Sequence, residues 1–100
     1  MIAVSTDEIR YISAASGLAK LHLSEKRIFT IDLSLDEIER QLDPDMFLRV
    51  TRYHVVNVHA VERLTTWFGR KTKVQVADWP DAEIYVIKEK APAPKRGLDR

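Results

Sequence analysis

The segment FLRVTRYHVVNVHAV, residues 47–61, combines the aliphatic side chains of a β-strand with several cations around an aromatic ring. Arg49 and Arg52 lie three residues apart, and Tyr53 and His54 follow directly. A buried strand does not tolerate an unpaired guanidinium group. Arginine beside tyrosine suits phosphate contact and bidentate recognition of guanine edges. These residues therefore indicate an anionic ligand, and nucleic acid in particular.

The spacing of the two arginines determines how they could act. In a continuous strand Arg49 and Arg52 would point to opposite faces. The apolar alternation fails across residues 52–54, and a regular alternation of valines follows. We therefore predict a turn at residues 51–53, with Arg52 directed toward the ligand. For Arg49 two interpretations stay open, a phosphate contact and an ion pair with the acidic segment before it, and the ion pair is favoured.

Other chemistry finds little support in the sequence. The histidines His22, His54 and His59 lack the spacing of a metal site, and no serine has the context of a nucleophile elbow. The three glycines form no phosphate-binding loop. The chain has no cysteine, which excludes thiolate metal sites and disulfides. We predict that the protein is not an enzyme and that it uses no metal or cofactor.

Length and composition predict an ordinary cytoplasmic domain. The chain has 100 residues, of which 45% are hydrophobic and 31% charged, and it can form a core without disulfides. No apolar run approaches the ~20 residues that span a bilayer, and the start lacks the features of a signal peptide. We expect one domain over residues 1–100, with residues 91–100 as a basic tail that contains proline, and no membrane contact.

Charge is distributed unevenly along the chain. Residues 1–45 hold nine acidic and five basic residues, and residues 46–100 hold six acidic and eleven basic residues. The net charges are therefore −4 and +5. A polyanion would be attracted to the second part and repelled by the first. Judged by charge alone, two solvated surfaces are the simpler interpretation.

The elements that must position these residues are mostly strands. Strands are expected around residues 9–13, 20–24 and 28–32, with turns at Ser16-Gly17 and residues 24–26. Ile9 and Tyr11 are expected on one face of the first strand. The valine alternation predicts a strand over residues 55–61, a hairpin should form around Gly69, and residues 83–87 should form the last strand.

One amphipathic helix is expected in SLDEIERQLDP, residues 34–44. Ser34 at the N-cap and Glu37 three residues later form a capping box. Three apolar residues fall on one face at helical spacing: Leu35, Ile38 and Leu42. Pro44 should end the helix. The fold class is therefore mostly β, with one amphipathic helix and small packed antiparallel sheets.

The order of these elements resembles the LytTR-type DNA-binding domain of bacterial transcription regulators. The central family pattern is F-x-R-[VI]-H-R-S-x-[LV]-V-N, and the chain has FLRVTRYHVVN at residues 47–57. The segment IRYISAASG resembles the family's I-x-Y-I-E-A-x-G, and EIYVIKEKAPAPKR resembles its closing strand with a basic tail. The resemblance covers most of the chain.

The resemblance implies sequence-specific binding of double-stranded DNA by loops in the major groove. Family members usually bind repeated promoter elements as two copies, which implies a homodimer on DNA and a response-regulator output module. The residues carried over are Ala15, Ser16 and Gly17 in the first loop, Arg49, Thr51, Arg52 and Tyr53 in the central loop, and Lys88 with Lys90 at the last strand. Phosphate contacts are also expected from Lys71, Lys73, Lys95 and Arg96.

Three positions depart from the family pattern. Thr51 replaces a histidine, Tyr53 replaces a serine, and Ile87-Lys88 replaces a closing Ser-Arg pair. Because lysine is a point charge where arginine is a planar fork, Lys88 suits phosphate contact better than base recognition.

The alternative is a protein-interaction module of a signalling protein that has lost base-specific contacts. Such a module could use a strand edge or three aromatic residues expected at turns: Trp67, Phe68 and Trp79. The simpler interpretation of these aromatic residues is that they close the core at the hairpin ends.

Overall fold

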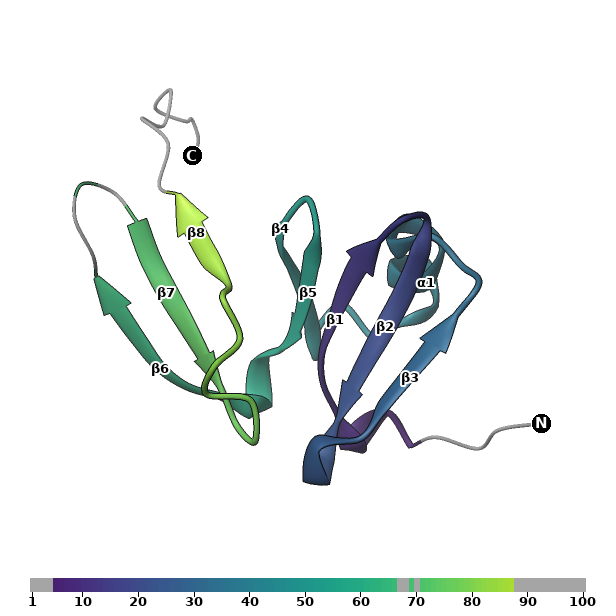
Figure 1. Cartoon of the computed structure of the whole chain (residues 1–100), viewed down its shortest axis with the longest axis horizontal. Coiled ribbons are helices and arrows are strands. Elements are labelled where there is room, and N and C mark those ends of the chain that lie inside the picture. The colour runs from purple at the N-terminus through teal and green to yellow at the C-terminus, as the bar shows by residue number, and fades with distance from the viewer. Residues whose placement is uncertain (1–4, 67–68, 70, 88–100) are drawn as a thin grey trace.

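A computed structural model describes residues 5–66, 69 and 71–87 (Figure 1). Within these residues, eight strands form two antiparallel sheets. The strands are β1 (Ile9–Ala15), β2 (Leu18–Leu23), β3 (Ile28–Ile31), β4 (Phe47–Thr51), β5 (His54–Asn57), β6 (Val61–Thr66), β7 (Lys71–Val76) and β8 (Tyr85–Ile87). The helices are α1 (Leu35–Gln41) and the short 3-10 helices η1 (Thr6–Glu8), η2 (Ser24–Lys26) and η3 (Val58–Ala60). The expected fold class of antiparallel sheets with one α-helix is confirmed.

The larger sheet has the strand order β3-β2-β1-β5-β4, and the smaller one has the order β6-β7-β8. Every pairing is antiparallel. The hairpin of β6 and β7 was expected around Gly69, whose φ of 68° is the conformation that favours glycine at a turn. The five-stranded order requires β1 to pair with β5, a contact between segments more than forty residues apart.

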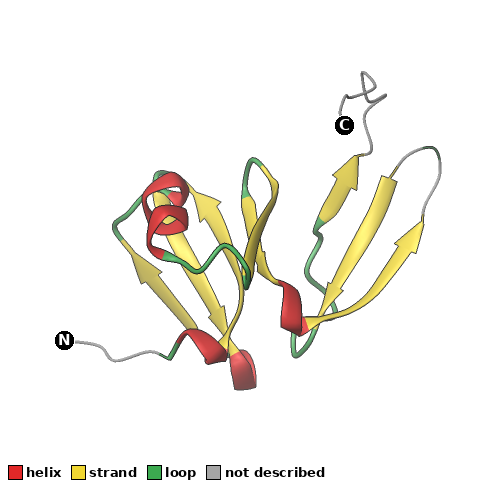
Figure 2. Cartoon of the chain, turned by 180° about the vertical axis from the view of Figure 1, so that it is seen from behind, coloured by secondary structure: helices red, strands yellow, loops and turns green. Residues whose placement is uncertain are grey.

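Helix α1 forms where the sequence places its capping signals. The Ser34 hydroxyl accepts a hydrogen bond from the Glu37 N–H at 3.1 Å, and the Ser34 N–H donates to Glu37 Oε1 at 2.8 Å. Leu35 and Ile38 are buried, and Leu42 is partly buried on the same side. Figure 2 shows the helix lying over one face of the five-stranded sheet. No helix in the described part of the chain is long and apolar enough to cross a membrane.

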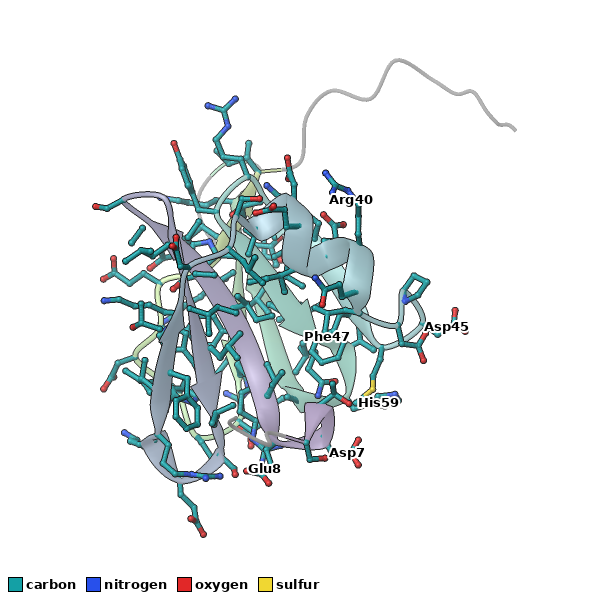
Figure 3. The ribbon with its side chains drawn as sticks, turned by 90° about the vertical axis from the view of Figure 1, so that its right-hand side faces the viewer. Asp7, Glu8, Arg40, Asp45, Phe47 and His59 are labelled. Carbon is teal, nitrogen blue, oxygen red and sulfur yellow. The ribbon has the colours of Figure 1, made fainter. Side chains whose placement is uncertain are left out.

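The five-stranded sheet buries residues on both of its faces. The helix-side core consists of Ile9, Ile12, Ala19, Leu21, Leu23, Leu35, Ile38, Phe47 and Val55. Phe47 points into this core from the start of β4 (Figure 3). The second core consists of Tyr11, Val56, Ala60, Val74, Val76 and Ile84, and it joins the larger sheet to the smaller one.

Two local expectations are wrong. Ile9 and Tyr11 do not share a face: the register shifts between them, and they enter different cores. A β-bulge of this kind adds a residue and reverses the side-chain alternation. The strand expected over residues 55–61 is interrupted by η3. Its cap is Asn57, whose Oδ1 accepts from the His59 N–H at 2.9 Å while its Nδ2 donates to the Ile9 carbonyl at 2.9 Å.

Candidate nucleic-acid interface

The turn predicted within residues 51–53 is present between β4 and β5. Arg52 and Tyr53 form its tip, and both are exposed, with 56% of the Tyr53 surface accessible. The Tyr53 carbonyl accepts a hydrogen bond from the Ala14 N–H at 2.9 Å, which ties the turn to β1. No carboxylate within the described part of the chain forms an ion pair with Arg52. Its guanidinium group therefore extends from the scaffold toward solvent.

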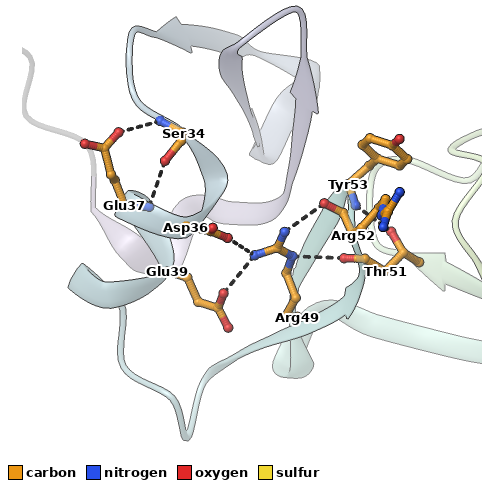
Figure 4. Close-up of polar contacts among 8 residues, drawn as sticks. All are labelled: Ser34, Asp36, Glu37, Glu39, Arg49, Thr51, Arg52 and Tyr53. Atoms are coloured by element: carbon orange, nitrogen blue, oxygen red, sulfur yellow. Dashed lines mark hydrogen bonds and ion pairs between the residues drawn. The ribbon is translucent and has the colours of Figure 1, made fainter.

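Arg49 has very different surroundings (Figure 4). Its Nη1 donates to Asp36 Oδ1 at 2.8 Å and to Glu39 Oε1 at 2.9 Å, so the favoured ion pair with the acidic helix is confirmed. Its Nε donates to the Thr51 carbonyl at 3.0 Å, and its Nη2 donates to the Arg52 carbonyl at 2.8 Å. The hydrogen bond and charge of Arg49 lower the pKa of Asp36 below its usual value.

The Thr51 hydroxyl is engaged inside the same turn. Its Oγ1 accepts from the Tyr53 N–H at 3.0 Å and lies 2.8 Å from His54 Nδ1. Burial lowers the pKa of His54, which favours the neutral ring at this contact. The side chains of residues 49 and 51 thus bond within the scaffold, while those of residues 52 and 53 lie on its outside.

The β1–β2 turn has the backbone that its sequence predicts. Ser16 and Gly17 both have positive φ, at 54° and 79°, and both are exposed. A two-residue hairpin turn of this type matches the natural twist of its strands. Because Ser13 pairs with His54, this turn and the β4–β5 turn leave the sheet at the same end (Figure 1). Two segments far apart in the sequence therefore form one end of the molecule. We call it the turn end, and it consists of residues 16–17 and 51–53.

The smaller sheet contributes a basic face. Lys71 and Lys73 alternate along β7 with the buried Val74 and Val76, and so project from the opposite face. Arg63 pairs with Gln75 and belongs to this face too. Lys71 Nζ lies 4.6 Å from the centre of the Tyr85 ring. Arg63 is not among the residues predicted from the sequence, because only the strand register reveals that it accompanies the two lysines.

Several predicted positions lie outside the described residues: Lys88, Lys90, Lys95, Arg96, Trp67 and Phe68. The acidic residues Asp7 and Glu8 lie at the end of the molecule opposite the two turns (Figure 3). Arg27 pairs with Glu8 at that end, so charges of both signs meet there.

An aromatic cluster packs between the sheets. The Tyr11 and His22 rings stack at 3.9 Å between centroids, and Trp79 meets His22 edge-on at 4.8 Å. The Trp79 Nε1–H donates to the Leu23 carbonyl at 2.9 Å. Burial, Lys20 and His54 lower the pKa of His22 to about 4. Trp79 therefore closes the core. Within the described residues, no group of three or more histidine or acidic side chains could hold a metal ion.

Comparisons with known proteins agree with this arrangement. The model of the LytTr DNA-binding domain family matches residues 1–97. An uncharacterized response regulatory protein of Vibrio cholerae is 32% identical over 76 residues, which are 73% of this chain and 29% of that protein. The chain thus spans less than a third of the length of this curated relative.

One similar solved structure is the LytTr DNA-binding domain of a response regulator from Bacillus cereus. It superposes with a TM-score of 0.76 at 22% sequence identity, over 86% of this chain and 76% of that chain. At this identity the likeness extends to the fold, including the antiparallel sheets and the helix.

Proposed function

The chain belongs to the LytTR DNA-binding domain family, and from this premise we propose that it binds double-stranded DNA sequence-specifically through its turn end. The observation that carries the proposal is the exposed Arg52 at the tip of the β4–β5 turn, beside the β1–β2 turn. The major groove admits elements of this width and presents a distinct pattern of donors and acceptors for each base pair.

Within this interface Arg52 recognises a base edge, since its guanidinium group can form two parallel hydrogen bonds to guanine. Tyr53 lies beside it and contributes a ring for contact with the sugar-phosphate backbone or a base. Ser16 and Gly17 approach the backbone closely, because neither has a bulky side chain. Thr51 contributes by fixing the turn.

Phosphate contacts come from the basic face of the smaller sheet. Arg63, Lys71 and Lys73 carry no sequence information but supply affinity and orientation. Lys88 and Lys90 follow β8 in the sequence, outside the described residues, and we propose them as further phosphate contacts. Because these cations displace condensed counterions, binding should weaken steeply with salt.

The biological role proposed is that of an output module of a transcription regulator in two-component signalling. It rests on the family and on the response regulatory protein that the chain resembles. Residues 1–100 would act as one domain, bind repeated promoter elements as two copies, and work in the cytoplasm where the DNA lies. Nothing in this role requires catalysis or a cofactor.

The experiment is a selection from a randomised duplex pool, with affinities of the enriched duplexes titrated against salt. We expect a repeated short element to be enriched and its affinity to fall with salt. The control is Arg27→Ala, which removes an exposed arginine that follows η2 at the opposite end of the molecule and pairs there with Glu8. An unenriched pool without salt dependence would refute DNA binding.

The second candidate is a protein-interaction module, and one observation favours it. An apolar groove of about 520 Å³ lies between the two sheets. Its lining includes Leu48 and Leu64, which are 53% and 64% exposed. Trp79, by contrast, packs inside the aromatic cluster and offers no docking surface. If no sequence is enriched from the randomised pool, this candidate replaces DNA binding as the proposed function.

A further inference from the structure

We infer that Arg49 is a positioning residue that holds the β4–β5 turn against α1 and so sets the direction of Arg52. The inference rests on the proposed function and adds to it a residue that acts from behind the interface. We call this group the Arg49 clamp: Arg49, the carboxylates of Asp36 and Glu39, and the carbonyls of Thr51 and Arg52 (Figure 4).

Four of the five N–H donors of the Arg49 guanidinium group bond within the scaffold. Its Nη1 donates to two carboxylates, its Nε donates to one carbonyl and its Nη2 donates to another, which leaves a single N–H without a hydrogen bond. The side chain is only 26% exposed. A phosphate would have to approach two carboxylates that repel it and would find almost no free donor. Arg49 is therefore poorly placed for phosphate contact.

The guanidinium group of Arg49 joins α1 to the β4–β5 turn. On one side it contacts α1, and on the other it contacts the backbone of the last residue of β4 and of Arg52 itself. The carbonyl of Arg52 is thus fixed while its side chain stays exposed. Ordering a side chain or loop during binding costs free energy, and a turn held beforehand reduces that cost.

The inference predicts an effect opposite to that of simple electrostatics. Two carboxylates near a DNA-binding end repel DNA, so their removal should strengthen binding to every duplex if charge alone matters. If they hold the clamp, their removal should release the turn and weaken binding to the correct sequence. The quantity that separates the two is the ratio of affinities for specific and shuffled DNA.

The first experiment uses the double variant Asp36→Asn/Glu39→Gln. The probes are a duplex enriched from the randomised pool by the wild-type chain and a shuffled duplex of equal length and composition. We expect the specificity ratio to fall roughly tenfold, as for the loss of charge-assisted hydrogen bonds, while shuffled DNA binds equally or more tightly. The control Glu25→Gln/Asp32→Asn removes the same charge outside the clamp and should preserve the ratio. An unchanged or increased ratio in the clamp variant overturns the inference.

The second experiment compares Arg49→Lys with Arg49→Gln. Lysine keeps the charge, but its ammonium group cannot donate hydrogen bonds to two carboxylates and two carbonyls as the planar guanidinium group does. We therefore expect both variants to lose the specificity ratio to a similar extent, with the salt slope of shuffled binding unchanged. If Arg49→Lys behaves as wild type while Arg49→Gln lowers the salt slope by about one, Arg49 contacts phosphate and the inference fails.

A measurement without DNA keeps the clamp testable even if the proposed function fails. The Ala14 N–H donates to the Tyr53 carbonyl, and the Tyr53 N–H donates to Thr51 Oγ1, so both amides report on the turn. In Asp36→Asn/Glu39→Gln we expect both to exchange with solvent several-fold faster than in wild type, while amides of β2 do not change. Unchanged solvent exchange at both amides overturns the clamp. If the two amides exchange faster but no sequence is enriched from the randomised duplex pool, only DNA binding is overturned.

Discussion

Arg49 and Arg52 have the same side chain and differ in what surrounds it. Two carboxylates and two carbonyls take up the guanidinium group of Arg49, whereas Arg52 extends from a turn without an ion pair to any described carboxylate. A guanidinium group that is already paired has little to gain from a second anion. An exposed one exchanges only water for a base edge, so recognition is expected at residue 52.

Replacement of Arg52 by alanine tests this assignment. We expect Arg52→Ala to cost about 1–3 kcal/mol on the selected duplex and to relax specificity at one base pair, because a bidentate contact to one base is lost. Competition binding against a series of duplexes with single base-pair changes measures both effects. Equal losses on the selected and a shuffled duplex would contradict base recognition by Arg52, and Arg27→Ala should change neither.

The buried His22 makes stability depend on pH. Its pKa of about 4 in the folded chain lies below the ordinary 6.5, so the unfolded chain binds the proton more tightly. The free energy of unfolding should therefore fall as the pH drops below 6.5, and the loss is complete below about 4. Between about pH 7 and about pH 5 the expected loss is about 2 kcal/mol.

Urea unfolding at the two pH values measures this loss. In His22→Phe a ring remains against Tyr11 but cannot be protonated, so most of the pH dependence should disappear. A smaller part should persist, because burial also lowers the pKa of His54. If the variant loses as much stability as wild type over the same range, His22 is not the group responsible.

At the scale of elements, α1 is stabilised at its first turn. Ser34→Ala removes the hydroxyl that accepts from the Glu37 N–H and should lower the free energy of unfolding by about 1 kcal/mol. Urea unfolding at neutral pH measures the change. Ser34→Asp keeps an acceptor at the cap and should remain close to wild type, so equal destabilisation in the two variants would rule out capping as the cause.

The sequence predicts those elements whose causes are local. The capping box, the apolar face of α1 and the Ser16-Gly17 turn depend on residues within a few positions of one another, and all are present. The bulge between Ile9 and Tyr11 and the break at η3 could not be predicted in this way. Tyr11 turns toward the smaller sheet, where its ring meets the edge of Trp79 from the distant β7–β8 connection, while His22 of the neighbouring strand β2 stacks on it. The one local signal of η3 is Asn57, a residue type that favours helix caps.

Across the whole molecule, some features of the candidate site follow from local sequence and others depend on the pairing of distant strands. The exposed turn at Arg52 and Tyr53 follows from a failed alternation in the sequence. Its proximity to the β1–β2 turn depends on the pairing of β1 with β5, which no local pattern specifies. The Arg49 ion pair was expected from the acidic helix nearby, but its contacts with two carbonyls depend on a register shift between Arg49 and Thr51.

The distribution of charge over the whole molecule determines how the affinity for DNA should depend on salt. Arg63, Lys71 and Lys73 project from one face of the smaller sheet, and the carboxylates of Asp7 and Glu8 lie at the other end of the molecule from the turns. If DNA bound at the two turns extends over this face, it contacts these cations. Replacing each cation by alanine should reduce the slope of log affinity against log salt by about one.

These cations should also differ from Arg52 in their effect on specificity. Phosphates are alike in every sequence, so Lys71→Ala, Lys73→Ala and Arg63→Ala should weaken the selected and shuffled duplexes equally. Lys26→Ala is the matched control, because Lys26 belongs to η2 at the opposite end and should leave the slope unchanged. Titrations of all four variants over a range of salt concentrations measure the slopes. If the three cations of the smaller sheet leave the slope at its wild-type value, DNA does not contact that face, and the interface is confined to the two turns.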